Sequence, residues 1–594
     1  MKLREVLESY TVETLKPLAN FCGGSAITRK AELVEHIVHV MTTPEGMRQQ
    51  WEQLDDLSRK AVSLAVHNGG QFDEAVFLAR YGRLPSRPGS KWSWERKPIR
   101  LDLFIHNGRI PDDLLPILET WVPRLEPFRI EGRPEVPATI KLGSEKYELL
   151  RAETEHTGPS DLAAFLRLVQ RGEVSVTPSG LMPTAATVKK LLAQLREGDF
   201  LTHAETLKAA ETIRPVGLTL FAIQSGLSRR AQSYGGKLEL TDAGRAWLRT
   251  QEPELLLQAL EQWTQSNLFD ELSRIRAIRG QNARGTSLSP PSHRRERIVE
   301  ALSWCPAGVW IDIEDFFRAI VAWQLDFEVE TTGYSNLYVG YAGYAHEYTW
   351  GDASAYWRII HGLYILAVLW ETLATIGAVD IAYLLPEEAN YQAEVYYYDE
   401  LYFSLYDGLK YFRINPLGAY LFGQRAEYAP FARSRPPFLQ AVADPSASPH
   451  GVILRVIAPE QVTPSDKLML TTVAVPLDDG SYRIDLDSLL TALEQEHDLQ
   501  AALAYIQEWH NGPVPDELTA LFREGIARGK AFSVPAAALT INVEDPELAR
   551  MVVADDKLKR FCRLAGDRTI VIPANRERAF RNRLRELKYV VPIR

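Results

Sequence analysis

Two short stretches of the chain, LELTDAGRAWL (238–248) and FRINPLGAYLF (412–422), share one pattern. Each begins with alternating apolar and polar residues, as half-exposed strands do. Each then places a capping residue, Thr241 or Asn415, at the start of a new helix. The pattern therefore predicts two related units in which a strand leads directly into a helix. These units are centred near 205–250 and 295–423.

A strand that ends in such a cap is common at the edge of the wing in winged-helix domains. Residues 50–110 also open as a winged helix does, with a helix, a Gly turn and a second helix that Asp73 caps. Residues 159–200 predict a helix, a short strand, a turn and a helix that Thr184 caps. We therefore expect a mainly α fold with α/β elements, built from tandem winged helices. Their predicted bounds are 46–140, 141–280 and 295–430, the last with an aromatic insertion.

Two stretches rich in Gly, Ser and Pro predict breaks between these units. The first, 281–294, is predicted to be a linker, and the second isolates a C-terminal module at 450–594. In this module Asp485 and Asp498 are predicted to cap helices. Its tail predicts strand, helix, strand, helix and a last strand at YVVPI (589–593), which together make a small α/β sandwich.

The composition indicates an ordinary globular protein of several domains. A length of 594 residues predicts about four units. The three cysteines form no CxxC pair, which fits a reducing cytosol. The N-terminus has no apolar signal-peptide core, and LYILAVLW (363–370) is too short to cross a bilayer and predicts a buried helix. We therefore expect a cytoplasmic protein with no membrane partner.

The sequence contains no recognised catalytic or cofactor motif. The Gly-Lys pairs at 236–237 and 529–530 lack the Ser or Thr of a P-loop, so the Asp-Glu pairs at 270–271 and 399–400 are interpreted as solvated helix-end carboxylates. No HExxH, GxSxG elbow or paired-carboxylate nuclease pattern occurs. His36 and His39 lie one helical turn apart, but no matching Cys or carboxylate cluster accompanies them. We predict no enzyme activity, no cofactor and no metal ligand.

The net charge is −10, so any affinity for nucleic acid must come from local basic patches. One such patch combines cations with tryptophans, which could pair with phosphates and stack on a base. The alternative is a solvated wing whose tryptophans pack on the domain. This first cluster consists of Arg80, Arg83, Arg87, Lys91, Arg96, Lys97 and Arg100, with Trp92 and Trp94. The aromatic runs Tyr334–Trp357 and Tyr396–Tyr398 are interpreted as packing, because tyrosines at this spacing more often fill an insertion or an interface.

Two more basic clusters follow. The second crosses the predicted linker, where it would track a phosphate backbone or serve as a solubilising link. It consists of Arg274, Arg276, Arg279, Arg284, Arg294, Arg295 and Arg297. The third lies on the final helix, whose Phe580, Leu584 and Leu587 face inward, so that its cations face DNA, an acidic partner or solvent. It consists of Arg576, Arg578, Arg581, Arg583, Arg585 and Lys588.

Several segments resemble known families. TRK (28–30) before AELVEHI resembles the SAP motif, a small DNA-binding module, which implies that residues 1–45 form such a module and that Arg29 and Lys30 contact phosphates. Residues 450–594 resemble the N-terminal region of the XPB family of DNA translocases, most clearly from YRIDLDSLLTALEQEHDLQAALAYIQEW (482–509) onward. The segments LFDELSRIRAIRGQ, RRERIVEALSWCPAGVWI and SLYDGLKYFRINPLGAYLFG resemble a bacterial helicase-associated family. The order of domains is similar to that of the TFIIH core subunit that holds XPB.

These resemblances imply a non-catalytic, DNA-binding accessory or scaffold subunit of a helicase- or translocase-containing assembly. Its setting would be DNA repair or defence against foreign DNA. The expected partners are DNA and a separate helicase, translocase or nuclease subunit. Two alternatives stay compatible with the sequence: a scaffold that binds only proteins, and a winged-helix transcription regulator with a ligand-sensing aromatic segment.

Overall fold

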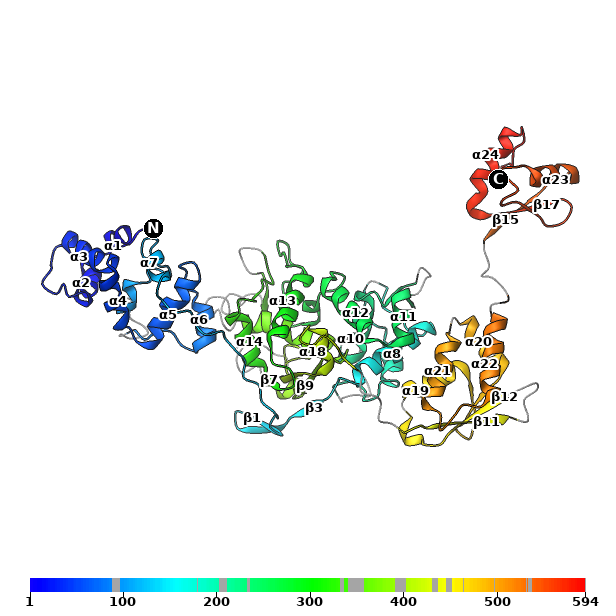
Figure 1. Ribbon diagram of the computed structural model, residues 1–594, viewed down its shortest axis with the longest axis horizontal. Helices are drawn as coiled ribbons and strands as arrows, with labels where there is room; N and C mark the ends of the chain where they lie inside the picture. The colour runs from blue at the N-terminus through cyan, green and yellow to red at the C-terminus, as the bar shows by residue number, and fades with distance from the viewer. Residues whose placement is uncertain are drawn as a thin grey trace.

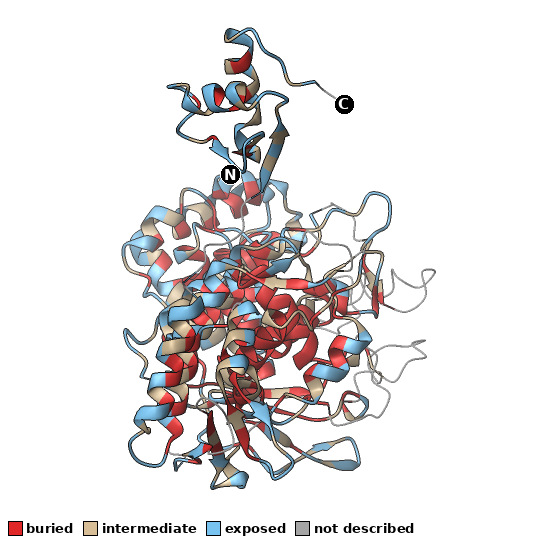
Figure 2. Cartoon of the chain, turned by 90° about the vertical axis from the view of Figure 1, so that its right-hand side faces the viewer, coloured by how far each residue is buried: buried red, intermediate tan, exposed pale blue. Residues whose placement is uncertain are grey.

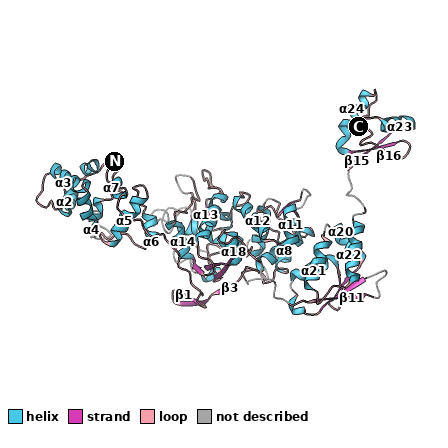
Figure 3. Cartoon of the chain, in the orientation of Figure 1, coloured by secondary structure: helices cyan, strands magenta, loops and turns pink. Residues whose placement is uncertain are grey.

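Helices dominate the chain, and the strands form small antiparallel sheets (Figure 1, Figure 3). The prediction of a mainly α fold with α/β elements is confirmed at this level. The computed structural model describes residues 1–87, 97–178, 180–201, 211–231, 236–331, 336–339, 357–389, 402–429, 436–444, 451–462, 464–495, 497–529, 531 and 537–592.

An N-terminal body is built around one hydrophobic core that runs from Leu3 to Val122. The Asp73 carboxylate accepts a hydrogen bond from the Val76 amide at 3.0 Å, which confirms the predicted cap of the second helix of the Gly turn. The helices of this body are α1 (Leu3–Ser9), α2 (Val12–Phe21), α3 (Lys30–Thr42), α4 (Pro44–Glu52), α5 (Asp56–His67), α6 (Glu74–Tyr81), η1 (Arg100–Leu103) and α7 (Leu115–Glu119).

This core crosses the predicted boundary between residues 1–45 and 46–140. Leu3 and Leu118 belong to the same cluster, and the Leu3 amide donates to the Asp113 carboxylate at 2.9 Å. Apart from isolated bridges, the described residues between 46 and 138 form no strand. The two predicted units are therefore one helical body, and its described part contains no wing hairpin. The first hairpin comes after this core and consists of β1 (Thr139–Leu142) and β2 (Glu145–Glu148).

Burial of His106 in the N-terminal body predicts a pH-dependent stability. Its Nδ1 lies 3.1 Å from the Tyr10 hydroxyl oxygen, and burial lowers the pKa of the imidazole to about 4. The pKa in the unfolded chain is about 6.5, so the neutral ring contributes its full stability above that pH and loses it as the pH falls toward 4. Between about pH 7 and pH 5, we expect the wild type to lose about 2 kcal/mol more than His106→Gln in calorimetric unfolding. Equal losses in the two proteins would contradict this expectation.

Two repeats with the same order of elements follow. In the described residues, each contains a helix, a short strand, two helices, two strands and a final helix. The second repeat also has β8 (Tyr338–Val339) between its second and third helices and η7 (Pro386–Glu388) between its last two strands. The first repeat contains α8 (Thr157–Gln170), the bridged segment 174–176, α9 (Ala185–Leu192), α10 (Arg214–Gln224), β4 (Ser228–Arg230), β5 (Leu238–Leu240) and α11 (Asp242–Thr250). The second contains α13 (Pro291–Trp304), β7 (Trp310–Asp312), α14 (Ile313–Ala322), the continuous helix of η5 (Arg358–Gly362), α17 (Leu363–Ala367) and η6 (Val368–Ala374), then β9 (Val379–Tyr383), β10 (Leu409–Ile414) and α18 (Pro416–Leu421).

The predicted strand-to-helix junctions are confirmed in both repeats. Thr241 Oγ1 accepts a hydrogen bond from the Gly244 amide at 3.1 Å, and Asn415 Oδ1 accepts one from the Gly418 amide at 2.9 Å. A Cβ on either glycine would lie 2.0 or 1.9 Å from a backbone carbonyl oxygen, so a larger residue would force the backbone apart. The short sequence similarity thus marks the same cap and the same close approach in each repeat. Thr184 also caps α9 as predicted.

The two repeats share one hydrophobic core, and we call residues 130–429 the central body. β3 (Leu150–Ala152), which precedes the first repeat, pairs with β9 of the second in a sheet of order β3-β9-β10-β7. Figure 2 shows the buried residues gathered toward the middle of the molecule, and the largest cluster of buried apolar residues belongs to this body. The segment between the repeats contains α12 (Pro253–Gln265), η3 (Glu271–Arg274) and β6 (Ile278–Arg279), and β6 pairs with β8 (Tyr338–Val339).

The predicted linker at 281–294 is not a break between domains. Leu288 bridges to Glu330, α13 begins at Pro291, and the Arg294 side chain is fully buried. Gly, Ser and Pro mark turns here as the sequence suggests, but the turns run through the shared core. The boundary predicted at this linker is therefore replaced by a continuous central body.

The helix that precedes the last two strands is buried in both repeats. Every residue of α10 is buried, and so is every residue from Gly362 to Ala374, which confirms LYILAVLW as a buried helix. The two helices pack closely, because a Cβ on Gly217 would lie 2.0 Å from the Glu371 carbonyl oxygen. Among the described residues, no helix is both long enough and apolar enough to cross a membrane.

A third core, which we call the β11 body, covers residues 436–529. The Asp485 and Asp498 carboxylates accept hydrogen bonds from amides of the helices they precede, which confirms both predicted caps. β11 pairs with β12, so this body begins ahead of the predicted boundary at residue 450. Its elements are β11 (Leu439–Asp444), β12 (Gly451–Val456), η9 (Pro459–Gln461), α19 (Pro464–Val473), β13 (Val475–Pro476), β14 (Tyr482–Ile484), α20 (Leu486–Glu494), α21 (Leu499–Trp509) and α22 (Asp516–Gly529).

The last described residues, 537–592, form a final body with its own small core. The predicted module at 450–594 is therefore two bodies with separate cores and separate sheets. The strand predicted at YVVPI is wrong over its described residues, because Tyr589 to Pro592 pair with no strand. The elements are β15 (Ala538–Asn542), α23 (Pro546–Ala554), β16 (Arg563–Leu564), β17 (Thr569–Pro573), η10 (Ala574–Arg576) and α24 (Glu577–Glu586).

Candidate nucleic-acid interface

A row of arginines follows the outer face of α24. Phe580 and Leu584 are buried and anchor one face of this helix, as the predicted apolar stripe requires. Arg578 and Arg585 lie seven positions apart and, at 3.6 residues per turn, project from the opposite face. Both are exposed, as is Arg576 just before the helix. None of these three arginines has an ion-pair partner in the described part of the chain.

Two other arginines of α24 are held by carboxylates. Arg583 contacts the Asp555 carboxylate through Nε at 3.1 Å and through a terminal nitrogen at 2.7 Å, and it also pairs with Glu586. The hydrogen bond from Arg583 lowers the pKa of Asp555 to about 2. Arg581 donates to Glu577 at 2.8 Å and to the Val591 carbonyl at 2.6 Å. The helix therefore divides its cations between internal ion pairs and an unpaired outer row.

The final body is basic although the chain is acidic. Residues 538–592 contain twelve Lys and Arg and eight Asp and Glu, a net charge of +4, while the whole chain carries −10. Exposed Arg560 and Arg568, which lie outside the three predicted clusters, belong to this excess, as does the predicted Lys588. These cations are spread over the segment and form no single basic run, so the sequence signal that reveals them is the net charge of residues 538–592.

The SAP-like segment also presents cations to solvent. Arg29 precedes α3, its side chain is 82% exposed, and its guanidinium lies 3.4 Å from the Glu32 carboxylate. Lys30 donates to the Glu8 carbonyl at 2.7 Å. His36 Nε2 lies 2.9 Å from the Cys22 carbonyl oxygen. No group of three or more His, Cys, Asp or Glu side chains in the described residues is placed to hold a metal ion.

Only some of the described cations of the first basic cluster are free of polar contacts within the protein. Arg87 makes a two-pronged contact with the Asp102 carboxylate at 2.7 and 2.8 Å, and Arg80 donates to the Glu126 carbonyl. Arg83 and Lys97 are exposed. Several predicted residues lie outside the described part of the chain: Lys91, Trp92, Trp94 and Arg96, together with most of the aromatic run Tyr334–Trp357 and all of Tyr396–Tyr398.

The second cluster requires a correction, because its central arginines lie inside the protein. Arg274 contacts Glu371 at 2.7 Å, Arg294 contacts Asp270 at 2.5 Å, and Arg295 is fully buried. These arginines cannot reach a phosphate backbone. Those that stay exposed are Arg276, Arg279, Arg284 and Arg297, and Arg297 pairs with Glu300.

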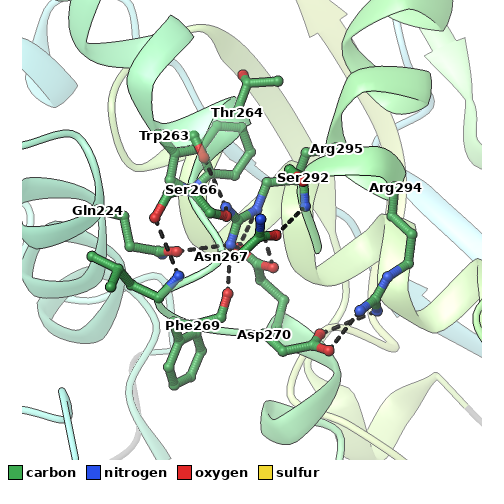
Figure 4. A network of polar contacts seen from close by, with 12 residues as sticks. Gln224, Trp263, Thr264, Ser266, Asn267, Phe269, Asp270, Ser292, Arg294 and Arg295 are labelled. Atoms are coloured by element: carbon green, nitrogen blue, oxygen red, sulfur yellow. Dashed lines mark hydrogen bonds and ion pairs between the residues drawn. The ribbon is translucent and has the colours of Figure 1, made fainter. Parts of the chain in front are cut away.

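Arg295 is the centre of a network that joins both repeats (Figure 4). Its guanidinium donates to the Glu271 carboxylate at 3.0 Å, to the carbonyls of Trp263, Ser266 and Phe269 at 2.7 to 2.8 Å, and to Gln224 Oε1 at 2.9 Å. Gln224 ends α10 of the first repeat, and Arg295 lies on α13 of the second. Glu271 is therefore a buried partner of Arg295, which corrects its interpretation as a solvated carboxylate. The pair Asp399–Glu400 lies outside the described residues.

The buried helices limit how the repeats could contact DNA. A helix that reads a groove must offer side chains to the base edges. All of α10 is buried, and in the second repeat the corresponding helix is buried from Gly362 onward. Any contact with nucleic acid would therefore have to come from exposed cations elsewhere, and the outer row of α24 is the best-defined group of these among the described residues. No protein-family model matches the sequence, and no curated protein matches it either.

Proposed function

We propose that the protein is a non-catalytic, DNA-binding scaffold that works beside a separate helicase, translocase or nuclease subunit. The observation that carries this proposal is the unpaired row of Arg576, Arg578 and Arg585 on a final body of net charge +4. Guanidinium groups without internal partners are suited to phosphate contacts, which supply most of the affinity in binding that does not depend on sequence. The resemblance of this region to the N-terminal region of XPB-type translocases favours the same role.

The arrangement of the two repeats supports a scaffold rather than a reader of base sequence. Their order of elements is that of winged helices, and we propose that they are such domains. The helices that would enter a groove instead pack against each other in the central body. Affinity should therefore depend on phosphate contacts and vary little with the sequence of the DNA.

The salt dependence of DNA binding tests this proposal. The variant Arg576→Gln/Arg578→Gln/Arg585→Gln should bind duplex DNA more weakly, by about tenfold for each phosphate contact that the substitutions remove, at about 0.1 M salt. The slope of log K against log salt should shrink by about 0.9 for each of these contacts. Both quantities can be measured by fluorescence anisotropy with a labelled duplex at several salt concentrations.

A control variant separates a local effect from a change in total charge. Arg229→Gln/Arg297→Gln/Arg528→Gln removes the same charge from exposed arginines that lie outside the final body and pair with nearby glutamates. Its slope should match that of the wild type. An equal weakening in both variants, or wild-type binding that does not respond to salt, would contradict a phosphate interface on α24.

A protein-binding scaffold is the second candidate. Exposed apolar side chains lie in the same final body, including Met551, Tyr589 and Val590, and the chain as a whole is acidic. A mixed apolar and arginine-rich face is typical of protein interfaces. Capture of a motor subunit that survives nuclease treatment, from a chain that shows no affinity for DNA at low salt, would select this candidate.

A further inference from the structure

A pocket of about 460 Å³ lies where the first repeat meets the β11 body. Residues of α8 and α11 line one side, residues of α19 and α21 line the other, and α19 packs against α8 (Figure 1). Its volume is in the range of small-molecule sites. The role proposed for α24 makes no use of this pocket.

One wall of the pocket is cationic. Arg245 and Arg249 lie one helical turn apart on α11, and Arg167 of α8 lies beside them. Arg249 is exposed, and its guanidinium has no partner in the described part of the chain. Arg245 is steadied by hydrogen bonds to Asp242 at 2.9 Å and to the Leu240 carbonyl at 3.1 Å. This wall therefore presents the exposed guanidinium of Arg249 beside that of Arg245, whose orientation is fixed by hydrogen bonds.

The carboxylates of the pocket are already engaged. Asp242 accepts the hydrogen bond from Arg245, and Asp498 accepts the amides of Gln500 and Ala501 at 2.8 and 3.2 Å. An anion that enters the pocket would therefore face arginines, while the two carboxylates of the pocket already accept hydrogen bonds from the protein.

His497 supplies a second, independent sign of a ligand. The residue lines the pocket and is 6% exposed, and its Nε2 has no hydrogen-bond partner among the described residues. Burial, together with the nearby charge of Arg171, lowers the pKa of the ring to about 4, so the ring is neutral at pH 7. An unpaired buried ring nitrogen is costly, and a ligand or ordered water would satisfy it.

The remaining lining is apolar. Leu248 contributes from α11, Met469 from α19 and Ala502 from α21. A wall of this kind favours the body of a small organic molecule, because it rewards the removal of apolar surface from water.

We propose that this pocket binds a small organic phosphate. Its phosphoryl group would face Arg245 and Arg249, whose planar guanidinium groups suit several phosphate oxygens at once. Its apolar or aromatic body would lie against Leu248 and Met469. Nucleoside monophosphates are one member of this class.

Calorimetric titration of the full chain tests the proposal with four probes. Phenyl phosphate and adenosine 5′-monophosphate should bind. Adenosine and inorganic phosphate should bind much more weakly, with dissociation constants of about 1 mM. Arg249→Gln should weaken binding of the two organic phosphates by about tenfold or more, with unchanged thermal unfolding in their absence. Ala501→Phe, which fills the pocket, should abolish binding.

The matched control is Arg229→Gln, which removes a 68% exposed arginine from β4 of the same repeat, outside the pocket lining. It should bind like the wild type. The absence of binding by both organic phosphates, or equal affinities in the wild type and Arg249→Gln, would overturn the proposal. A DNA oligonucleotide that displaces adenosine 5′-monophosphate, and that binds Arg249→Gln more weakly to the same extent, would overturn the assignment to a small molecule.

Discussion

Arg295→Met is expected to destabilise the central body by about 4 kcal/mol. The substitution leaves the buried Glu271 carboxylate without its cation, and it removes the donors that satisfy three backbone carbonyls and Gln224. Removing one partner of a buried ion pair costs far more than the pair contributes, because the other charge stays desolvated. Differential scanning calorimetry of the full chain should show the transition of the central body move to lower temperature.

Two companion variants show whether the loss of stability belongs to the network. Arg297→Ala lies on the same helix, at an exposed position paired with Glu300, and should change stability by about 1 kcal/mol or less. The double variant Glu271→Met/Arg295→Met should recover part of the stability, because no buried charge is left unpaired. A cost for Arg295→Met no larger than that of Arg297→Ala would show that the network contributes little to stability.

Gly217→Ala is expected to destabilise the central body by about 3 kcal/mol. In an ordinary helix interior this change stabilises by about 1 kcal/mol, because alanine restricts the unfolded chain and favours the helix. Here the new Cβ would lie 2.0 Å from the Glu371 carbonyl oxygen and 3.0 Å from Thr375 Oγ1, so α10 must move away from the helix of the second repeat. The same shift would disturb the ion pair between Glu371 and Arg274. Calorimetry of the full chain measures the effect.

Gly525→Ala is the matched control, since it makes the same change within another helix. Its Cβ would lie 3.3 Å from Leu489 Cβ and 3.3 Å from Leu499 Cδ1, so these neighbours need to move by only a few tenths of an ångström. Its effect should stay within about 1 kcal/mol in either direction. A loss of stability from Gly217→Ala no larger than that from Gly525→Ala would contradict the close packing of α10 against the buried helix of the second repeat.

Local signals in the sequence predicted local structure well. Each of the caps at Thr241 and Asn415 involves residues three positions apart, and both are confirmed. The inward stripe of α24 is a local pattern of the same kind. Such features follow from backbone geometry and the nearest turn of helix, so they need no knowledge of the rest of the fold.

Long-range pairing was the part that the sequence could not predict. Arg274 lies before the stretch of Gly, Ser and Pro at 281–294, and Arg295 lies directly after it. The sequence therefore predicted that both arginines are exposed on a linker. The partner of Arg274, Glu371, lies 97 residues away, and Gln224 lies 71 residues from Arg295. For the candidate interface, the sequence placed Arg578 and Arg585 on the outer face of their helix, but it could not separate them from Arg583, whose partner Asp555 lies in a neighbouring element. An arginine cluster alone does not show whether its partners are phosphates or distant carboxylates.

The sheet of the central body also bears on how the protein is made. β3 ends at residue 152 and pairs with β9, which begins at residue 379, so β3 has no partner strand until more than 200 further residues have been synthesised. During synthesis, the first repeat leaves the ribosome with α10 uncovered until the buried helix of the second repeat arrives. Strands and helices that lack their partners during synthesis expose apolar surface and are prone to aggregate. The Gly-, Ser- and Pro-rich stretch at 281–294 is therefore a poor place at which to divide the chain, because a cut there would separate the two halves of one folding unit.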